Sequence, residues 1–456
     1  MRQVNVIVIE TPELGDRSYI AYDETVAIVI DPQRDVDRVE SHLESLGVEL
    51  AMVCETHLHN DYVTGGLELA QRYGAPYLVG GGHEALFACH EPHDGETFQV
   101  GGMTVTAILS PGHTEGHVSY LIGPEGSPPS IFTGGSMLFG TVGRTDLVSH
   151  EATDRLTRAQ YGSVRRMAFE LEADIQVQPT HGFGSFCSSA STSGVSESTI
   201  GQEKTTNIAC VTPDEETFVR TLLSGLTAYP RYYSHMGPLN RSGTSYPFLL
   251  QPPPMVDAEE LKRRLNRGEW VIDLRSRREF AKEHIRGTIG VEHNNSFTTY
   301  LGWVLPWGMP LTVLGESTEQ VLRAQRDLSR IGVDRFSGMA IASEALGWGL
   351  EVESYQALSF TELAERRGAD ADVVVLDVRR IDEWEAGHLE GAQHVPLQDL
   401  VARIDEITAD GEIWVHCAAG FRASIGASLV SRSERQVILI DDAWENASKT
   451  DLSFVK

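Results

Sequence analysis

The sequence predicts a multidomain α/β protein, and three observations support that prediction. The chain has 456 residues, more than one hydrophobic core usually organises. In the first half, short apolar strands run into histidines, which is typical of a layered α/β scaffold whose site lies on loops at a sheet edge. In the second half, one stretch of sequence occurs twice, which indicates two similar domains in tandem.

Charge restricts the partners. The chain has 37 Lys and Arg against 65 Asp and Glu, a net charge of −28 that is spread along the sequence. A surface of that sign repels phosphate backbones and anionic lipid. We therefore expect neither a nucleic-acid nor a membrane partner.

The cysteines and the first residues indicate the compartment. Five cysteines are scattered without CxxC spacing, which argues against a disulfide framework. Residues 1–16 carry a short apolar run followed by acidic residues, unlike a secretory signal, and no apolar stretch is long enough to span a bilayer. We expect a cytoplasmic protein, and the oligomeric state is left open, a homo-oligomer included.

Residues 1–250 are expected to form one domain of alternating strands and helices. A helix is expected at 36–47, because apolar residues recur there at helical spacing. The apolar runs predict strands at 4–10, 18–32, 50–59, 103–113, 118–123, 130–135 and 174–182.

The end of this domain shows two changes of composition. The Ser- and Gly-rich segment 184–201 predicts a linker or a mobile cover. A helical extension is expected over 211–242, with Thr212 as its N-cap and Glu215 completing a capping box. The proline-rich residues 251–255 predict a domain boundary.

An internal repeat divides the second half. The segment "VIDLRSRREFAKEHIRG" (271–287) matches "VLDVRRIDEWEAGHLEG" (375–391) at a constant offset. We therefore predict two similar α/β domains, 256–355 and 356–456, with a seam near 352–360.

The second copy carries a reactive loop that the first copy lacks. In "IWVHCAAGFRAS" an apolar strand ends at Cys417, and a Gly-containing loop leads into a small-residue helix. Such a loop points backbone N–H groups inward and stabilises an anion, so Cys417 would ionise easily. The simpler alternative is a small buried cysteine at a strand end. No cysteine occurs between Cys210 and Cys417, so the first copy cannot carry sulfur.

The repeated segment and the Cys-x4-Arg loop resemble the rhodanese family of sulfurtransferases. The resemblance implies that Cys417 accepts sulfane sulfur and that the loop holds it through main-chain N–H groups. The implied loop residues are Ala418, Ala419, Gly420, Phe421 and Arg422.

The stretch "THLHNDYVTGG" (56–66) places two histidines and an aspartate on one turn, a pattern typical of metal ligands. "SPGHTEGH" adds His113, and "QPTHGFG" adds His181. Taken in order, these motifs resemble the metallo-β-lactamase fold, its glyoxalase II-like branch, and most closely the persulfide dioxygenases fused to rhodanese domains. The resemblance implies an αβ/βα sandwich.

Two positions depart from that family. Tyr62 stands where the motif ends in histidine, and Gly135 stands where relatives carry an aspartate ligand. A second metal is therefore not expected. We predict one divalent cation, Fe²⁺ or Zn²⁺, on His57, His59 and His113.

Three alternatives remain for this metal. His59 takes the place of the lost carboxylate, or Asp61 swings in as the catalytic carboxylate, or the metal is weak or absent and the motif is a relic. We place Tyr62, as a hydroxyl donor, and His181 among the groups that contact substrate.

Three functions follow from these residues. The first is a metal-dependent persulfide dioxygenase-like domain coupled to a sulfurtransferase, with glutathione persulfide, thiosulfate or sulfite as small-molecule partners. The second is a zinc-dependent thioester hydrolase fused to rhodanese. The third is a sulfurtransferase whose N-terminal half is a non-catalytic binding module. Metal content and oxygen uptake distinguish the three.

Overall fold

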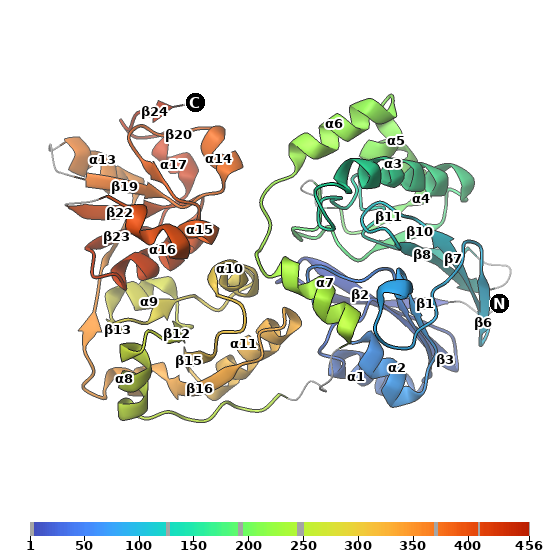
Figure 1. The fold of residues 1–456 in the computed structure, drawn as a ribbon, viewed down its shortest axis with the longest axis horizontal. Coiled ribbons are helices and arrows are strands. Elements are labelled where there is room, and N and C mark those ends of the chain that lie inside the picture. Colours follow the sequence, from blue (N-terminus) through green and yellow to red (C-terminus); the bar gives the residue numbers. More distant parts are fainter. Residues whose placement is uncertain are drawn as a thin grey trace. The chain divides into compact units, whose positions relative to one another are not determined.

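A computed structural model describes residues 4–124, 128–189, 195–243, 250–368, 373–408 and 411–455 (Figure 1). The chain divides into two compact units. The first comprises Met1–Leu249 with Ser329–Gly332, and the second comprises Leu250–Leu328 with Val333–Lys456. Both units combine sheets with helices, so the predicted α/β class is confirmed. No helix of the described residues is long and apolar enough to cross a membrane.

Two sheets form the centre of the first unit. Their strands are β1 (Asn5–Thr11), β2 (Asp16–Tyr22), β3 (Val26–Ile30), β4 (Glu49–Glu55), β5 (Tyr77–Val79), β6 (Thr97–Val100), β7 (Met103–Leu109), β8 (Val118–Pro124), β9 (Ser130–Gly134), β10 (Gln176–Pro179) and β11 (Ser198–Thr199). One sheet has the order β1-β2-β3-β4-β5 and the other β11-β10-β9-β8-β7-β6. Their facing side chains form one core, in which Tyr19 of the first sheet meets Phe132 of the second.

Helices cover the outer face of each sheet (Figure 1). They are α1 (Asp37–Leu46), α2 (Gly66–Tyr73), α3 (Thr153–Glu170), α4 (Ile200–Thr206), α5 (Ile208–Val211), α6 (Glu215–Gly225) and α7 (Tyr233–Ser242), with a 3-10 turn at Gly82–Glu84. The helices α1 and α2 pack on the first sheet, and α3 to α6 pack on the second. This arrangement is the expected αβ/βα sandwich.

Two local predictions in this unit are wrong. The helix cap is Asp214, whose carboxylate accepts the N–H of Thr217 at 2.8 Å, because Thr212 ends the preceding helix α5. The Ser-rich segment is not a loose linker in its described part, since Cys187 is fully buried and Ser198 lies in β11. Residues 190–194 lie outside the described residues.

The second unit contains two parallel sheets. The first copy has β12 (Trp270–Asp273), β13 (His284–Ile285), β14 (Ile289–Gly290), β15 (Leu311–Gly315), β16 (Phe336–Ile341) and β17 (Val352–Glu353). The second has β18 (Gln356–Leu358), β19 (Val373–Asp377), β20 (His388–Leu389), β21 (Gln393–His394), β22 (Glu412–His416), β23 (Val437–Ile440) and β24 (Phe454–Val455). The helices are α8 (Ala258–Asn266), α9 (Arg277–Lys282), α10 (Phe297–Val304), α11 (Thr318–Arg330), α12 (Ala342–Leu346), α13 (Phe360–Gly368), α14 (Ile381–Glu385), α15 (Leu397–Arg403), α16 (Phe421–Ser431) and α17 (Trp444–Ala447), with a 3-10 turn at Ile404–Glu406.

The two copies share one topology. The sheet orders are β14-β12-β15-β16 and β18-β23-β22-β19-β21, so the second sheet contains the order of the first with one added edge strand. The strand β15 of the first copy corresponds to β22 of the second, which leads to Cys417. After β15 the chain continues through Glu316 and Ser317 instead of a cysteine loop.

Candidate functional site

Three loops of the first unit bring histidines together. His57 follows β4, His113 follows β7 and His181 follows β10, and all three side chains are fully buried. Strand ends fix the loops, while the side chains beyond them are free to converge.

Hydrogen bonds fix the tautomer of each imidazole. Thr56 donates its hydroxyl proton to Asp31 at 2.8 Å, so its oxygen accepts from His57 Nδ1 at 2.9 Å. His113 Nδ1 donates to the carbonyl oxygen of Arg144 at 2.7 Å, and His181 Nδ1 donates to Asp16 at 2.9 Å. Each Nδ1 is thus engaged in a hydrogen bond, so Nε2 is the ring nitrogen of each histidine that is left for a metal.

The three imidazoles converge. The ligand atoms of His57, His113 and His181 all lie within 4.8 Å of one another, and His57 Nε2 is 3.4 Å from His181 Nε2. Two nitrogens on one tetrahedral Zn²⁺ are separated by roughly 3.3 Å, so this spacing suits a single ion.

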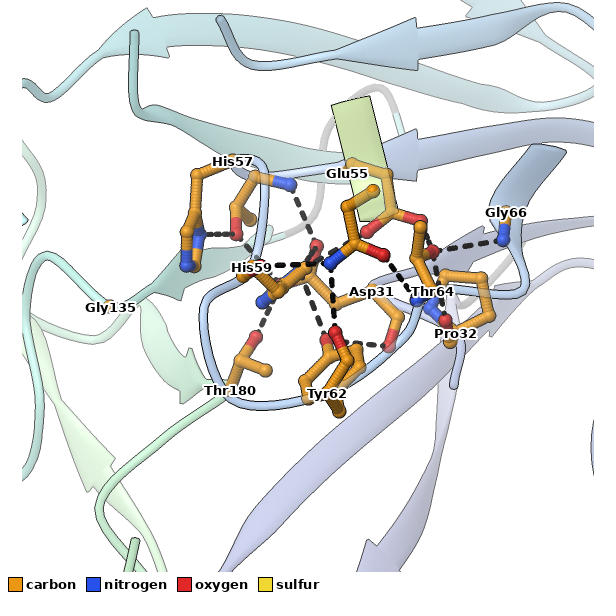
Figure 2. Close-up of polar contacts among 12 residues, drawn as sticks. Asp31, Pro32, Glu55, His57, His59, Tyr62, Thr64, Gly66, Gly135 and Thr180 are labelled. Atoms are coloured by element: carbon orange, nitrogen blue, oxygen red, sulfur yellow. Dashed lines mark hydrogen bonds and ion pairs between the residues drawn. The ribbon is translucent and has the colours of Figure 1, made fainter. Parts of the chain in front are cut away.

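His59 falls in other candidate ligand groups than the predicted set of His57, His59 and His113. Its Nε2 lies 3.1 Å from Glu55 and 3.3 Å from Asp31 (Figure 2). Burial alone would lower the pKa of His59, but Asp31 and Glu55 outweigh burial and raise that pKa to about 9. Among the described residues, one candidate ligand group consists of His57, His113 and His181. His59 occurs in two other groups, one with Asp61 and His181 and one with Asp31 and Glu55.

Tyr62 is fully buried, and its role as a hydroxyl donor to substrate stays a prediction. Its hydroxyl lies 3.0 Å from His59 Nε2 and 3.3 Å from the carbonyl oxygen of Asp31 (Figure 2). Its ring stacks on His59 with centroids 4.3 Å apart. The phenol therefore packs on His59 and lies within hydrogen-bond distance of it.

The imidazole ring of His113 packs directly against Gly135. A Cβ built on Gly135 would lie 2.6 Å from His113 Nε2 and still closer to Cδ2 of the same ring. The His113 ring therefore lies where the side chain of an aspartate at position 135 would begin.

Unpaired buried atoms test whether these residues fit a cation. His113 Nε2, His59 Nδ1 and Asp61 Oδ1 are buried without a hydrogen-bond partner among the described residues. An unsatisfied buried polar atom costs about 1–3 kcal/mol, so each is expected to have a partner. A divalent cation between the histidines would be such a partner, and the residues present fit one.

The surrounding carboxylates also favour positive charge. Asp61 and Asp16 both contact His181 Nδ1, at 3.1 and 2.9 Å, and both are buried. Burial alone would lower the pKa of His181, but the two carboxylates raise it. Asp61, predicted to be catalytic, and His181, predicted to contact substrate, thus lie in the buried centre and not on the pocket surface.

A pocket of about 450 Å³ lies beside the loops that carry His57 and His113. It is lined by Leu58 and Asn60 of the histidine turn, by Thr114 and Gly116 after His113, and by residues of α7 such as Tyr233. This volume is within the range of small-molecule sites.

The Cys417 loop lies in the second unit. Cys417 is 2% exposed, and Gly420 has a φ of +84° immediately before α16, a conformation that favours glycine. No acceptor for the backbone N–H groups of 418–422 is found in the described part of the chain, so they are available to an anion. Arg422 forms a bidentate ion pair with Glu383, at 2.5 and 2.7 Å.

The first copy contacts this loop. The ring of Tyr300 lies 5.8 Å from that of Phe421, and the Arg422 guanidinium is 5.9 Å from the Tyr300 ring. Asp441, which lies against Gly420, accepts from Arg277 at 2.7 Å and from Arg278 at 2.8 Å. The copy without a cysteine therefore supports the loop of the copy that has one.

Several of these residues carry no motif signal. Asp16, Asp31 and Tyr300 act through partners far away in sequence, and Glu55 through His59 four residues on. Only the positions of the three acids at strand ends could have indicated them. Asp31 has a φ of +49°, an uncommon backbone state at a functional site.

Comparisons with known proteins support the same division. The rhodanese-like domain family model matches residues 257–313 and 359–450. A crystal structure of a metallo-beta-lactamase from Staphylococcus aureus superposes with a TM-score of 0.66 at 25% identity, covering 74% of this chain and 99% of that chain. The chain is a fusion of a metallo-β-lactamase-fold domain with rhodanese-like domains.

Two curated relatives resemble its first part. The chain is 29% identical to the probable polyketide biosynthesis zinc-dependent hydrolase BaeB of Bacillus velezensis over 163 residues, 35% of this chain and 68% of that protein. It is 28% identical to the mitochondrial persulfide dioxygenase ETHE1 of Bos taurus over 211 residues, 46% of this chain and 74% of that protein. The relatives support an enzyme and differ in the reaction.

Restoring the missing carboxylate is expected to destabilise the protein. In Gly135→Asp the new side chain collides with the His113 ring, and overpacking of this kind costs about 1–3 kcal/mol. We expect a lower Tm and no gain in metal affinity, measured by thermal unfolding and Zn²⁺ titration. The control is Gly162→Asp on α3, where nothing lies within 4 Å. A variant that binds metal more tightly at unchanged Tm would contradict this packing.

Removing the link between the copies is expected to loosen the Cys417 loop. In Asp441→Asn both ion pairs are lost, and about 1 kcal/mol of loop stability corresponds to about a fivefold larger open population. The alkylation rate of Cys417, followed by mass spectrometry, should rise by that factor. Glu434→Gln, which removes the ion pair to Arg286 at 2.7 Å, is the matched control and should leave the rate unchanged.

Proposed function

We propose that the N-terminal domain binds one divalent cation on His57, His113 and His181 and processes a low-molecular-weight persulfide, and that Cys417 transfers sulfane sulfur. The convergence of three Nε2 atoms carries the metal assignment. The likeness to a persulfide dioxygenase and the rhodanese match on the same chain support sulfur chemistry.

The protein residues would orient the substrate and exclude water. A persulfide would enter the pocket beside Leu58 and Thr114, with its terminal sulfur directed at the imidazoles. A cation held there would supply Lewis-acid or redox chemistry. For oxidation the balance is one persulfide, one O₂ and one water giving one thiol, one sulfite and two protons.

The C-terminal step is a sulfur transfer. The thiolate of Cys417 would attack the sulfane sulfur of thiosulfate, and the S–S bond to sulfite would break, with sulfite leaving with the electron pair. The unpaired N–H groups of 418–422 would stabilise the resulting persulfide anion. Because both sites lie on one chain, they would share one pool of labile sulfur, and the local concentration of that sulfur would be raised.

A second candidate is hydrolysis of a thioester. Three neutral nitrogen ligands suit Zn²⁺, and the relative from Bacillus velezensis is described as a zinc-dependent hydrolase. Zinc with thioesterase activity and no oxygen uptake would support this function over the first.

Metal content tests the N-terminal assignment. Protein purified without added metal should carry about one equivalent of iron and should consume O₂ with glutathione persulfide. His113→Ala should lose the metal, because removal of one ligand costs orders of magnitude in affinity. His90→Ala, an exposed histidine paired with Glu96, is the control. Metal-free wild-type protein that is inert to O₂ would remove the proposal.

Cysteine replacement tests the C-terminal assignment. Cys417→Ser should abolish thiosulfate-dependent sulfur transfer, since serine cannot form a persulfide, and should leave metal content and oxygen uptake unchanged. The measurement is thiocyanate formation from thiosulfate and cyanide. Transfer that persists in this variant would show that another group carries the sulfur.

A further inference from the structure

Asn240 connects helix α7 to the histidine turn. Its side chain is 1% exposed. The amide nitrogen donates to the carbonyl oxygens of His59 and Tyr62, each at 2.8 Å, and the amide oxygen accepts the N–H of Thr64 at 3.0 Å. One side chain thus satisfies three backbone groups of a single turn, residues 59–64.

The same helix forms a wall of the pocket. Tyr233, Ser234, Gly237, Pro238 and Arg241 line it and recur at helical spacing, which places them on one side of α7. The backbone of α7 approaches the turn closely, since a Cβ on Gly237 would lie 3.0 Å from Asn60 Oδ1. Asn240 therefore joins the wall of the pocket to the turn that carries His57 and His59.

We infer that Asn240 is a positioning residue for the metal centre, which holds the histidine turn and the pocket wall in one geometry. The inference rests on the proposed function, in that the turn supports a cation. Groups that orient metal ligands typically contribute about 10–100-fold to metal affinity. No other residue type offers two donors and one acceptor at this reach, because Asp has no donor and Gln is longer.

Asn207 of the same unit provides a matched control. It is also fully buried, and its amide nitrogen donates to the carbonyl oxygens of Leu138 and Thr141, at 3.0 and 2.7 Å. Its amide oxygen accepts the N–H of Ala209 at 3.1 Å. The same nitrogen also donates to the buried carboxylate of Glu203 at 2.9 Å. None of these partners lies on the histidine turn, so its loss reports the cost of removing a buried asparagine away from that turn.

The experiment compares Asn240→Leu and Asn207→Leu in the full chain. Zn²⁺ affinity is measured by chelator competition, the Co²⁺ absorption spectrum reports the ligand geometry, and urea unfolding of the metal-free proteins reports stability. We expect similar losses of stability, a Zn²⁺ affinity about 10–100-fold weaker only in Asn240→Leu, and an altered Co²⁺ spectrum only in that variant. If Asn240→Leu does not fold, Asn240→Ala is the second variant, because the cavity that it leaves can admit water. It should also weaken Zn²⁺ affinity and alter the Co²⁺ spectrum.

The outcomes separate this inference from the proposed function. Wild-type protein that binds no Zn²⁺ overturns both. Wild-type protein that binds Zn²⁺, together with Asn240 variants of unchanged affinity and spectrum, overturns the positioning role and leaves the metal site in place. Equal weakening in the Asn207 variant also overturns it, because the effect would then follow from lost stability.

Discussion

The N-terminal domain depends on hydrogen bonds that hold Nδ1 of each imidazole and turn its Nε2 inward. Nδ1 of His57 donates to the hydroxyl of Thr56, which Asp31 holds. Nδ1 of His113 donates to the carbonyl oxygen of Arg144, and Nδ1 of His181 donates to the carboxylate of Asp16. Three Nε2 atoms are therefore left facing one another inside a buried, carboxylate-rich centre. Without those acceptors the rings could rotate or exchange tautomers, and the sandwich would present no defined ligand set.

The two family departures are coupled to this centre. Tyr62 and the two acids Asp31 and Glu55 all lie at Nε2 of His59, and the candidate ligand group that contains His57 does not include His59. Gly135 lets the His113 ring lie where an aspartate would start. His181 completes the set in place of His59, and its bonds to two carboxylates keep its Nε2 directed at His57.

The sequence predicts the fold well and the site in part. Strand periodicity, the repeat and the Cys-x4-Arg loop identify both halves, because each signal lies within a short stretch of chain. The contacts of His59 with Asp31 and of His181 with Asp16 could not be predicted, because they join segments far apart in the chain and motif spacing does not contain them. The same limit applies to Tyr300 and Asn240, whose partners lie in distant loops.

X-ray absorption spectroscopy of the metal-loaded protein tests the central claim most directly. Three histidine imidazoles in one ligand set predict three imidazole nitrogens in the first shell and no second metal nearby. A first shell with one or two imidazoles plus carboxylate oxygen, or a metal-to-metal distance of about 3.5–4 Å, would contradict the account.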